Sequence, residues 1–320
     1  TSRQLPVRDF ASRVIAVPGD LAKPLLGLTE QRFNELAERI DVIYHNGALV
    51  NFVYPYSMLK SANVLGTTEV LTLACRHHAK PLHYVSTLSV FEGRVGAPVP
   101  EETIPEANAG MTNGYSQSKW VAERIVMLAR SRGLPVAIHR PGRITGHSAT
   151  GVTNLHDMFS TFVRACIDVE AVPEVSGLDQ FYVDATPVDY VSQAIVRLGL
   201  TGEALGRAFH LCQPHPPTFA DLIHDMREFG ITLDEVPYDQ WRTKLIKLAK
   251  TADHHELAVL LPGMPTEVPD AIHSSRQWLC DATVDTLAKH GVTCPPFKGE
   301  VFATNLAFFA SRNPVPSRDA

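Results

Sequence analysis

Residues 114–144 read GYSQSKWVAERIVMLARSRGLPVAIHRPGRI, and this stretch decides the fold class. Its periodicity predicts a helix over about 115–131, and the apolar run after it predicts a strand over 136–140. A helix followed closely by a short apolar strand is the repeating unit of an α/β protein with a parallel sheet.

The same alternation continues on both sides of this stretch. Further strands are predicted over 13–17, 41–45, 82–86 and 207–211, and further helices over about 56–78 and after Thr29, which can cap a helix. The chain therefore predicts a Rossmann-like, doubly wound parallel sheet. The second half is richer in Pro, and its clearest predicted elements are helices over 189–198, 218–229 and 238–249.

We expect an interleaved division of the chain into two parts. A nucleotide-binding core would comprise 1–145, with 183–212 returning to it. A smaller and mostly helical substrate-binding lobe would comprise 146–182 and 213–320.

The composition narrows the class of protein. The chain has 320 residues, a formal net charge of -5 and five cysteines, none of which form a CxxC pair. Scattered cysteines predict reduced thiols, and the net charge gives no reason to expect nucleic acid. No apolar run approaches the ~20 residues of a membrane helix, and the opening residues lack the apolar core of a signal peptide. We expect a soluble cytoplasmic enzyme without a membrane partner.

Small and reactive residues follow each of four predicted strands. These are Gly19-Asp20, Asn46-Gly47-Ala48, Ser86-Thr87 and Pro141-Gly142-Arg143. Ligands of an open parallel sheet bind beyond the carboxyl ends of its strands. The four strand ends therefore predict one pocket, in which Gly47 and Gly142 would allow backbone to approach a flat cofactor closely.

The strongest local signal is Tyr115 followed by Lys119 at helical spacing i, i+4, which places both on one helix face. A nearby ammonium favours phenolate and would lower the tyrosine pKa from ~10, which makes Tyr115 a usable general acid. Tyr115 could protonate a developing alkoxide, and the Thr87 hydroxyl could stabilise the same alkoxide oxygen. Taken alone, a YxxxK match is more often an exposed helix pair, but the ordered set of strand ends favours a site.

These motifs resemble the extended short-chain dehydrogenases/reductases. Tyr115 and Lys119 match the family's YxxxK, and Thr87 in YVSTLSV matches its Ser/Thr position. The resemblance implies three catalytic residues, Thr87, Tyr115 and Lys119. It also implies a set of cofactor-binding residues: Asp20, Leu21, Asn46, Gly47, Ala48, Ser86, Lys119, Pro141, Gly142, Arg143 and Ile144. Asp189, in TPVDYV, matches a position that we interpret as structural, at a helix start.

Within that family, the chain is most similar to thioester reductase domains of nonribosomal peptide synthetases, carboxylic acid reductases and aminoadipate reductases. The phrases that carry this likeness are GDLAKPLLGL, IYHNGALVNFVYPY, NVLGTTEVL, YVSTLSVF and GYSQSKWVAE, all between Gly19 and Glu123. The resemblance implies NADPH as cofactor. It implies as substrate an acyl or peptidyl thioester on a phosphopantetheinylated carrier protein, reduced to an aldehyde or further to an alcohol.

One departure from the family matters for the cofactor. Family members begin with a strand and a Gly-rich turn that receives the pyrophosphate, and this sequence has neither. The strand predicted over 13–17 corresponds to the family's third, so roughly 60 residues would precede it. Either an upstream segment completes the site, or the native chain is shortened and NADPH binding is in question. The intact Thr87, Tyr115 and Lys119 set favours the first interpretation.

Other functions remain open at this level. One is a release domain of the same fold that does no redox chemistry and lets an internal carbanion cyclise onto the thioester. Others are a reductase of fatty-acyl thioesters, a nucleotide-sugar enzyme, against which the thioester-reductase phrases argue, and a non-catalytic scaffold that docks a carrier, which is the least favoured. No metal is expected, because the His77-His78 and His254-His255 pairs point to different helix faces. The basic run of Arg242, Lys244, Lys247 and Lys250 is either a solvated face or a docking surface for an acidic carrier.

Overall fold

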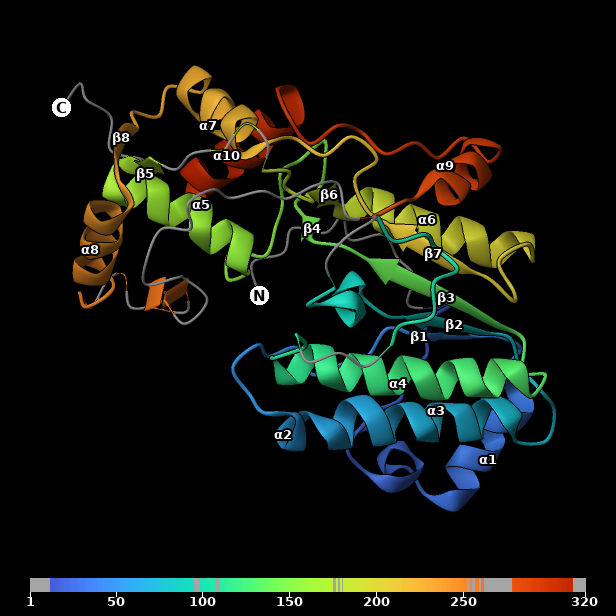
Figure 1. The fold of residues 1–320 in the computed structure, drawn as a ribbon. Coiled ribbons are helices and arrows are strands. Elements are labelled where there is room, and N and C mark those ends of the chain that lie inside the picture. Colours follow the sequence, from blue (N-terminus) through green and yellow to red (C-terminus); the bar gives the residue numbers. More distant parts are fainter. Residues whose placement is uncertain are drawn as a thin grey trace.

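The centre of the molecule is a parallel sheet. The computed structural model describes residues 12–94, 98–106, 110–174, 177, 179, 181–251, 254, 257, 258, 260, 261 and 278–312. Four strands lie in the order β1-β2-β3-β7 (Figure 1). They are β1 (Ile43–His45), β2 (Leu82–Val85), β3 (Val136–Pro141) and β7 (Ala208–Leu211), and every neighbouring pair is parallel.

Helices cover both faces of this sheet, as the alternating sequence pattern predicts. One face carries α3 (Gly66–Cys75) and α4 (Gly114–Ser131), and α6 (Val188–Thr201) lies on the other (Figure 1). Because side chains alternate along a strand, Tyr84 and Ile138 enter the α3/α4 core, whereas Phe209 enters the α6 core. The prediction of a doubly wound α/β fold is therefore confirmed.

Aromatic rings form a row across the sheet on the α6 face. The rings of Tyr44 and His83 stack at 4.7 Å, His83 and His139 at 5.5 Å, and His139 and Phe209 at 5.9 Å between centroids. His139 is fully buried, and burial lowers its pKa to about 3. The sheet interior thus holds neutral imidazole at physiological pH.

The strand expected over 13–17 is wrong. Val14 and Ile15 are 63% and 74% exposed, and this segment pairs with no strand among the described residues. A β-strand exists through its hydrogen bonds to a neighbour. The described sheet ends at β1, and this segment forms no ladder with it.

Several further elements before residue 190 connect these layers. Thr29 caps α1, since its hydroxyl accepts the Arg32 N–H at 3.2 Å, as expected. The long helix expected over 56–78 is present as three joined pieces ending at Cys75. The connecting elements are η1 (Pro24–Gly27), α1 (Glu30–Arg39), α2 (Tyr56–Lys60), the π-helical η2 (Ser61–Leu65), η3 (Leu88–Phe91), β4 (Ile144–Thr145) and β6 (Thr186–Pro187).

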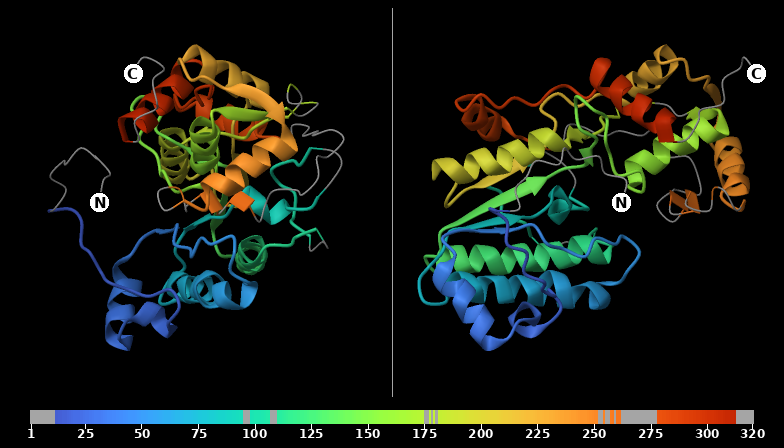
Figure 2. Two further views of the ribbon diagram at one scale, coloured as in Figure 1. Left: turned by 90° about the vertical axis from the view of Figure 1, so that its left-hand side faces the viewer. Right: turned by 180° about the vertical axis from the view of Figure 1, so that it is seen from behind.

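A second hydrophobic core lies beyond the carboxyl end of the sheet (Figure 2). Phe159 and Val163 are buried in it, and Phe162 packs against it. Trp241 is its largest fully buried side chain, and its indole N–H donates to Ala171 O at 2.9 Å. The elements of this lobe are α5 (Met158–Val169), β5 (Ala171–Glu174), α7 (Phe219–Glu228), β8 (Asp234–Pro237), α8 (Tyr238–Leu248) and α10 (Glu300–Arg312).

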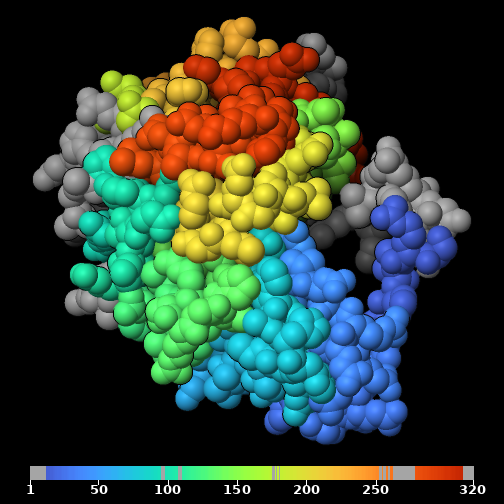
Figure 3. Space-filling model, turned by 90° about the vertical axis from the view of Figure 1, so that its right-hand side faces the viewer, coloured from blue at the N-terminus to red at the C-terminus, as the bar shows by residue number. Residues whose placement is uncertain are grey.

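One late helix returns to the sheet. In α9 (Asp281–Ala288), Leu287 packs in the same core as Phe209. The buried carboxylate of Glu101 holds the start of α9, because it accepts hydrogen bonds from Ala282 N (3.0 Å), Thr283 N (3.1 Å) and the Thr283 hydroxyl. Figure 3 shows the orange-red surface of α9 lying against the yellow surface of α6. The domain division given above stays a prediction, with α9 packed on the sheet side.

Among the helices of the described residues, none combines the length and the apolar character required to cross a bilayer.

Candidate active site

Three neighbouring strands end in the residues predicted to form a site. Asn46-Gly47-Ala48 follows β1, Ser86-Thr87 follows β2, and Pro141 ends β3. The strand registers pair His45 with Tyr84 and Val85 with His139, so these ends lie at one edge of the sheet. The structure therefore brings the predicted strand-end residues together.

The amino end of α4 sets Tyr115 at this edge. Asn113 caps the helix by accepting the Ser116 N–H at 2.8 Å. A Cβ on Gly114 would stand 2.4 Å from Tyr54 O, so only glycine lets the helix meet the preceding loop this closely. Tyr115 is 9% exposed, and the Phe52 ring lies edge-on to its ring at 5.1 Å between centroids.

Lys119 lies one turn further along α4 and is almost fully buried. Its ammonium donates to Val85 O at 2.8 Å and lies 4.4 Å from the centre of the Tyr84 ring. Burial lowers the pKa of Lys119 to about 8, while the charge of Glu123 acts in the opposite direction. Lys119 is thus tied to the end of β2.

The predicted effect of Lys119 on Tyr115 is wrong for this structure. Burial raises the pKa of Tyr115 to about 12 rather than lowering it. The reason is geometric, because Lys119 turns toward Val85 O and the Tyr84 ring. Tyr115 therefore keeps its proton at neutral pH and offers an O–H donor at the strand ends.

The two hydroxyls after β2 have different surroundings. Thr87 caps the short helix η3, and its oxygen accepts the Ser89 N–H at 3.2 Å. Ser86 is buried and donates its hydroxyl hydrogen to a carboxylate oxygen of Glu123. Thr87 is the more exposed of the pair, at 9%, and it is the hydroxyl that the sequence pattern singles out.

Sequence reasoning missed a buried ion pair beneath the site. Glu123 and Arg140 are both fully buried, and an Arg140 Nη2–H donates to Glu123 Oε1 at 2.7 Å. Arg140 also donates to the backbone carbonyls of Glu101 (2.7 Å) and Thr103 (3.0 Å). The pair joins α4, β3 and the segment that caps α9. Its only sequence signal is that Glu123 follows Lys119 at i+4.

A second missed residue is Asn63, which lies in the π-helical turn η2 and is 2% exposed. Its side-chain oxygen accepts the Leu49 N–H at 2.7 Å. Its amide donates to Leu49 O at 3.0 Å and to the Ser118 hydroxyl at 2.9 Å. Asn63 thereby fixes the loop after β1 against α4. The phrase NVLGTTEVL contained it, but no partner was readable there.

Asp20 and Leu21 lie beside the end of β1. A Cβ on Gly47 would stand 2.7 Å from Leu21 Cδ1, and one on Gly66 would stand 2.6 Å from Leu21 O. The Asp20 side chain is 45% exposed and lies 3.3 Å from Lys23 Nζ. The pKa of Asp20 is lowered by the Ala22 N–H and then by Lys23. Asp20, one of the predicted cofactor-binding residues, thus presents a carboxylate to solvent beside the end of β1.

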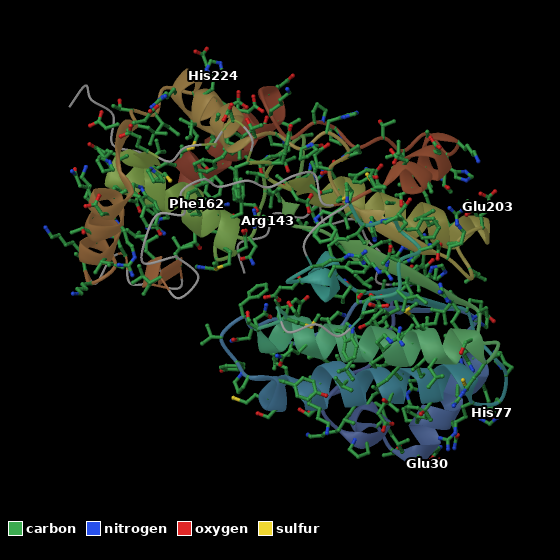
Figure 4. The ribbon with its side chains drawn as sticks, in the orientation of Figure 1. Glu30, His77, Arg143, Phe162, Glu203 and His224 are labelled. Carbon is green, nitrogen blue, oxygen red and sulfur yellow. The ribbon has the colours of Figure 1, made fainter. Side chains whose placement is uncertain are left out.

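A third missed residue, Asp184, holds the segment after β3. It accepts hydrogen bonds from Arg143 N (3.0 Å), the Thr186 hydroxyl (3.0 Å) and Gln213 N (3.2 Å). Burial raises the pKa of this carboxyl. Arg143 itself is exposed, and Figure 4 shows it on the side of the second lobe that faces α4. Ile144 is 39% exposed next to it.

Two other regions lie apart from these strand ends. A hollow of about 350 Å³ on the second lobe is lined by Glu174, His224 and Arg227 among others. Figure 4 places His224 on the outer side of that lobe and His77 at the opposite end of the molecule from His224. Within the described parts of the chain, no three His, Cys, Asp or Glu side chains group as metal ligands. His255 lies outside the described residues.

Comparisons with known proteins agree with this geometry. Residues 2–195 match the family described as "Male sterility protein", an NAD-binding family. The chain is 41% identical over 303 residues to a linear gramicidin synthase polypeptide of Brevibacillus parabrevis, a match that covers 94% of this chain and 6% of that protein. It is 36% identical over 251 residues to the L-2-aminoadipate reductase large subunit of Eremothecium gossypii, covering 74% of this chain and 18% of that protein. The chain thus spans a small part of these relatives.

One solved structure is similar over most of both chains. It is the terminal R domain from the myxalamid PKS-NRPS biosynthetic pathway, with 41% identity and a TM-score of 0.88. The match covers 96% of this chain and 78% of that one. The family match and this likeness confirm the resemblance that the sequence motifs indicated. The chain belongs to the terminal reductase (R) domains of nonribosomal peptide synthetases, within the extended short-chain dehydrogenases/reductases.

Proposed function

We propose that this chain carries out the NADPH-dependent reductive release of an acyl or peptidyl group held as a thioester on a carrier protein. The single observation that supports it most is the hydrogen bond of Lys119 to Val85 O, which ties the helix that carries Tyr115 to the end of β2, two residues before Thr87. L-2-aminoadipate reductase among the relatives is a reductase by name. This favours reduction over a cyclisation without redox chemistry.

The residues present fit a dinucleotide cofactor. The hydrogen bond to Val85 O uses one of the three N–H donors of Lys119, so two others can meet ribose hydroxyls. The backbone after β1 is accessible to a ligand at Asn46, Gly47 and Ala48. Beside it, the Asp20 carboxylate offers a hydrogen-bond acceptor. The nicotinamide would be bordered by the segment at the end of β3, which is Pro141, Gly142, Arg143 and Ile144. Ser86, at the end of β2, would lie next to it. When bound, reduced nicotinamide supplies a hydride.

Tyr115 would act at the carbonyl oxygen of the thioester. As hydride reaches the carbonyl carbon, negative charge develops on that oxygen. Tyr115 then donates its proton, and the Thr87 hydroxyl donates a hydrogen bond. The pKa of about 12 keeps Tyr115 protonated until that charge appears. The hemithioacetal next loses its C–S bond. Its hydroxyl proton returns to the Tyr115 phenolate, the thiolate takes up a proton from solvent, and the products are an aldehyde, the carrier thiol and NADP⁺.

Two measurements test the proposal. NADPH would be titrated by calorimetry into this chain and into the longest form that its gene encodes. NADPH oxidation would then be followed at 340 nm with an acyl thioester of pantetheine, and aldehyde would be identified by mass spectrometry. Binding together with aldehyde formation supports the proposal. Thioester consumption without NADPH oxidation would assign the chain to non-redox release.

A further inference from the structure

The loop between β1 and α2 is apolar and exposed. The loop and the first residues of α2, from Asn46 to Met58, read NGALVNFVYPYSM and contain no charged residue. Phe52 is 52% exposed, Val53 70%, Tyr54 40% and Met58 53%. A contiguous set of large apolar side chains in water is typical of a surface that binds something.

Hydrogen bonds hold this loop in a defined shape. The Asn51 side chain accepts the N–H groups of Val53 (2.9 Å) and Tyr54 (2.8 Å). Asn63 holds Leu49 through both of its backbone polar groups. The backbone around Tyr54 also packs closely against Gly114, at the start of α4. The exposed side chains therefore extend from backbone whose position is fixed. A pre-shaped surface binds at a lower entropic cost than a loose one.

The loop adjoins the reacting group. The Phe52 ring lies edge-on to the Tyr115 ring, with 5.1 Å between centroids, so the exposed apolar side chains begin at the proposed proton donor. The acyl chain is bonded to the carbonyl carbon whose oxygen Tyr115 would protonate. It must therefore extend from Tyr115 along a surface that borders the site, and this uncharged loop is one such surface.

We propose that Phe52, Val53, Tyr54 and Met58 form a binding surface for the acyl side of the thioester, and that the substrate is an uncharged, apolar acyl group. This inference rests on the proposed function. A carboxylate or ammonium near the thioester would lose water against these side chains without finding an opposite charge in the loop. An alkyl or apolar peptidyl group would gain by covering them.

The test uses pantetheine thioesters, which carry no carrier protein. Acetyl, hexanoyl and octanoyl thioesters are compared, together with an adipoyl monothioester as the anionic match to hexanoyl. We expect kcat/KM to rise at least ~10-fold from acetyl to octanoyl, because each fully buried methylene is worth up to ~4-fold. We expect adipoyl to fall at least ~10-fold below hexanoyl. Equal rates for acetyl and octanoyl, or for adipoyl and hexanoyl, would overturn the proposal.

Variants locate the effect. Val53→Asp should reduce the octanoyl-to-acetyl ratio severalfold, and Val53→Leu should retain it. Leu200→Asp is the matched control, because Leu200 is 72% exposed on α6 and should not change the ratio. A Val53→Asp effect confined to carrier-bound substrate would identify a carrier contact and refute an acyl surface.

Binding separates this proposal from the proposed function. Amide analogues of the acetyl and octanoyl thioesters cannot be turned over, and their affinities are measured by calorimetry. Tighter binding of the octanoyl amide, weakened by Val53→Asp, supports the acyl surface even if no NADPH is oxidised. Equal affinities of both amides would exclude it even in an active reductase.

Discussion

The carboxylate of Asp184 fills the space that a side chain on Gly142 would need. A Cβ built on Gly142 would stand 1.6 Å from Asp184 Oδ2, far inside van der Waals contact. The same carboxylate binds Arg143 N and Gln213 N, so one acidic side chain fixes the strand end predicted to meet the nicotinamide. Gly142 therefore serves the packing of Asp184.

Gly142→Ala should displace Asp184 and weaken NADPH binding at least ~10-fold, with about 1–3 kcal/mol lost from the free energy of unfolding. Calorimetry and urea titration measure the two effects. Asp184→Ala removes the obstacle, so the double variant should lose less than the sum of the single losses. Strict additivity would show that Gly142 does not act through Asp184.

Tyr115→Phe should lower kcat by ~10²-fold or more, because it removes the proton donor. NADPH affinity should stay within about twofold, since the ring and its contact with Phe52 remain. Single-turnover rates and NADPH titration measure the two quantities. If both fall equally, Tyr115 is a binding residue and the general-acid assignment fails.

Lys119→Ala should weaken NADPH binding by ~10-fold as well as slowing turnover, because the proposed ribose contact is lost. The change also removes the hydrogen bond to Val85 O, so a thermal melt is needed as a check on folding. Unchanged NADPH affinity in a folded variant would exclude the ribose role.

Glu123→Gln should lower the free energy of unfolding by about 3–5 kcal/mol, because it leaves the guanidinium of Arg140 buried without its counter-charge. Urea unfolding at neutral pH measures it. A loss below about 1 kcal/mol would mean that Arg140 has regained a partner. The double variant Glu123→Gln with Arg140→Met should recover part of the loss, since the guanidinium left without its counter-charge is also removed.

Stability should fall as the pH drops below about 6.5. Burial lowers the pKa of His45 to about 4 and the pKa of His139 and His210 to about 3. The unfolded chain therefore binds more protons than the folded one between about pH 6.5 and 3. In that pH window the histidines lower the free energy of unfolding, and above about pH 6.5 they do not change it. Each should remove about 1–2 kcal/mol by pH 5.

Urea unfolding at pH 7.5, 6, 5.5 and 5 checks this dependence. His139→Gln should flatten the slope by roughly one of these three contributions, whatever it does to stability at pH 7.5. A slope as steep as that of the parent chain would show that His139 is not a source of the effect.

The sequence could predict the parts of the fold that depend on local pattern. Apolar runs and helical periods located β1, β2, β3, β7 and α4 to within a few residues. The segment 13–17 has the same kind of pattern but forms no strand, because a strand also requires a neighbour. Pattern alone cannot distinguish these cases.

The site divides in the same way. Tyr115, Lys119 and Thr87 were readable because they lie at fixed spacing or at strand ends. Asp184 and Asn63 could not be predicted as site residues, because their partners are distant in the sequence. Asp184 binds Arg143, 41 residues earlier, and Asn63 binds Leu49, 14 residues earlier. The direction of the Tyr115 pKa was missed because it depends on where Lys119 turns, and that is set by Val85 and Tyr84.

The hold of Glu101 on α9 constrains how such reductases can be recombined. Its carboxylate meets the N–H groups of residues 181 and 182 positions later in the chain. A chimera that exchanges everything after residue 213 would separate this buried acceptor from the N–H groups of its helix and leave it with the His210 N–H at 3.3 Å. Hybrid enzymes that combine second lobes from different parents should therefore keep 98–106 and 278–290 from one parent, with the crossovers elsewhere.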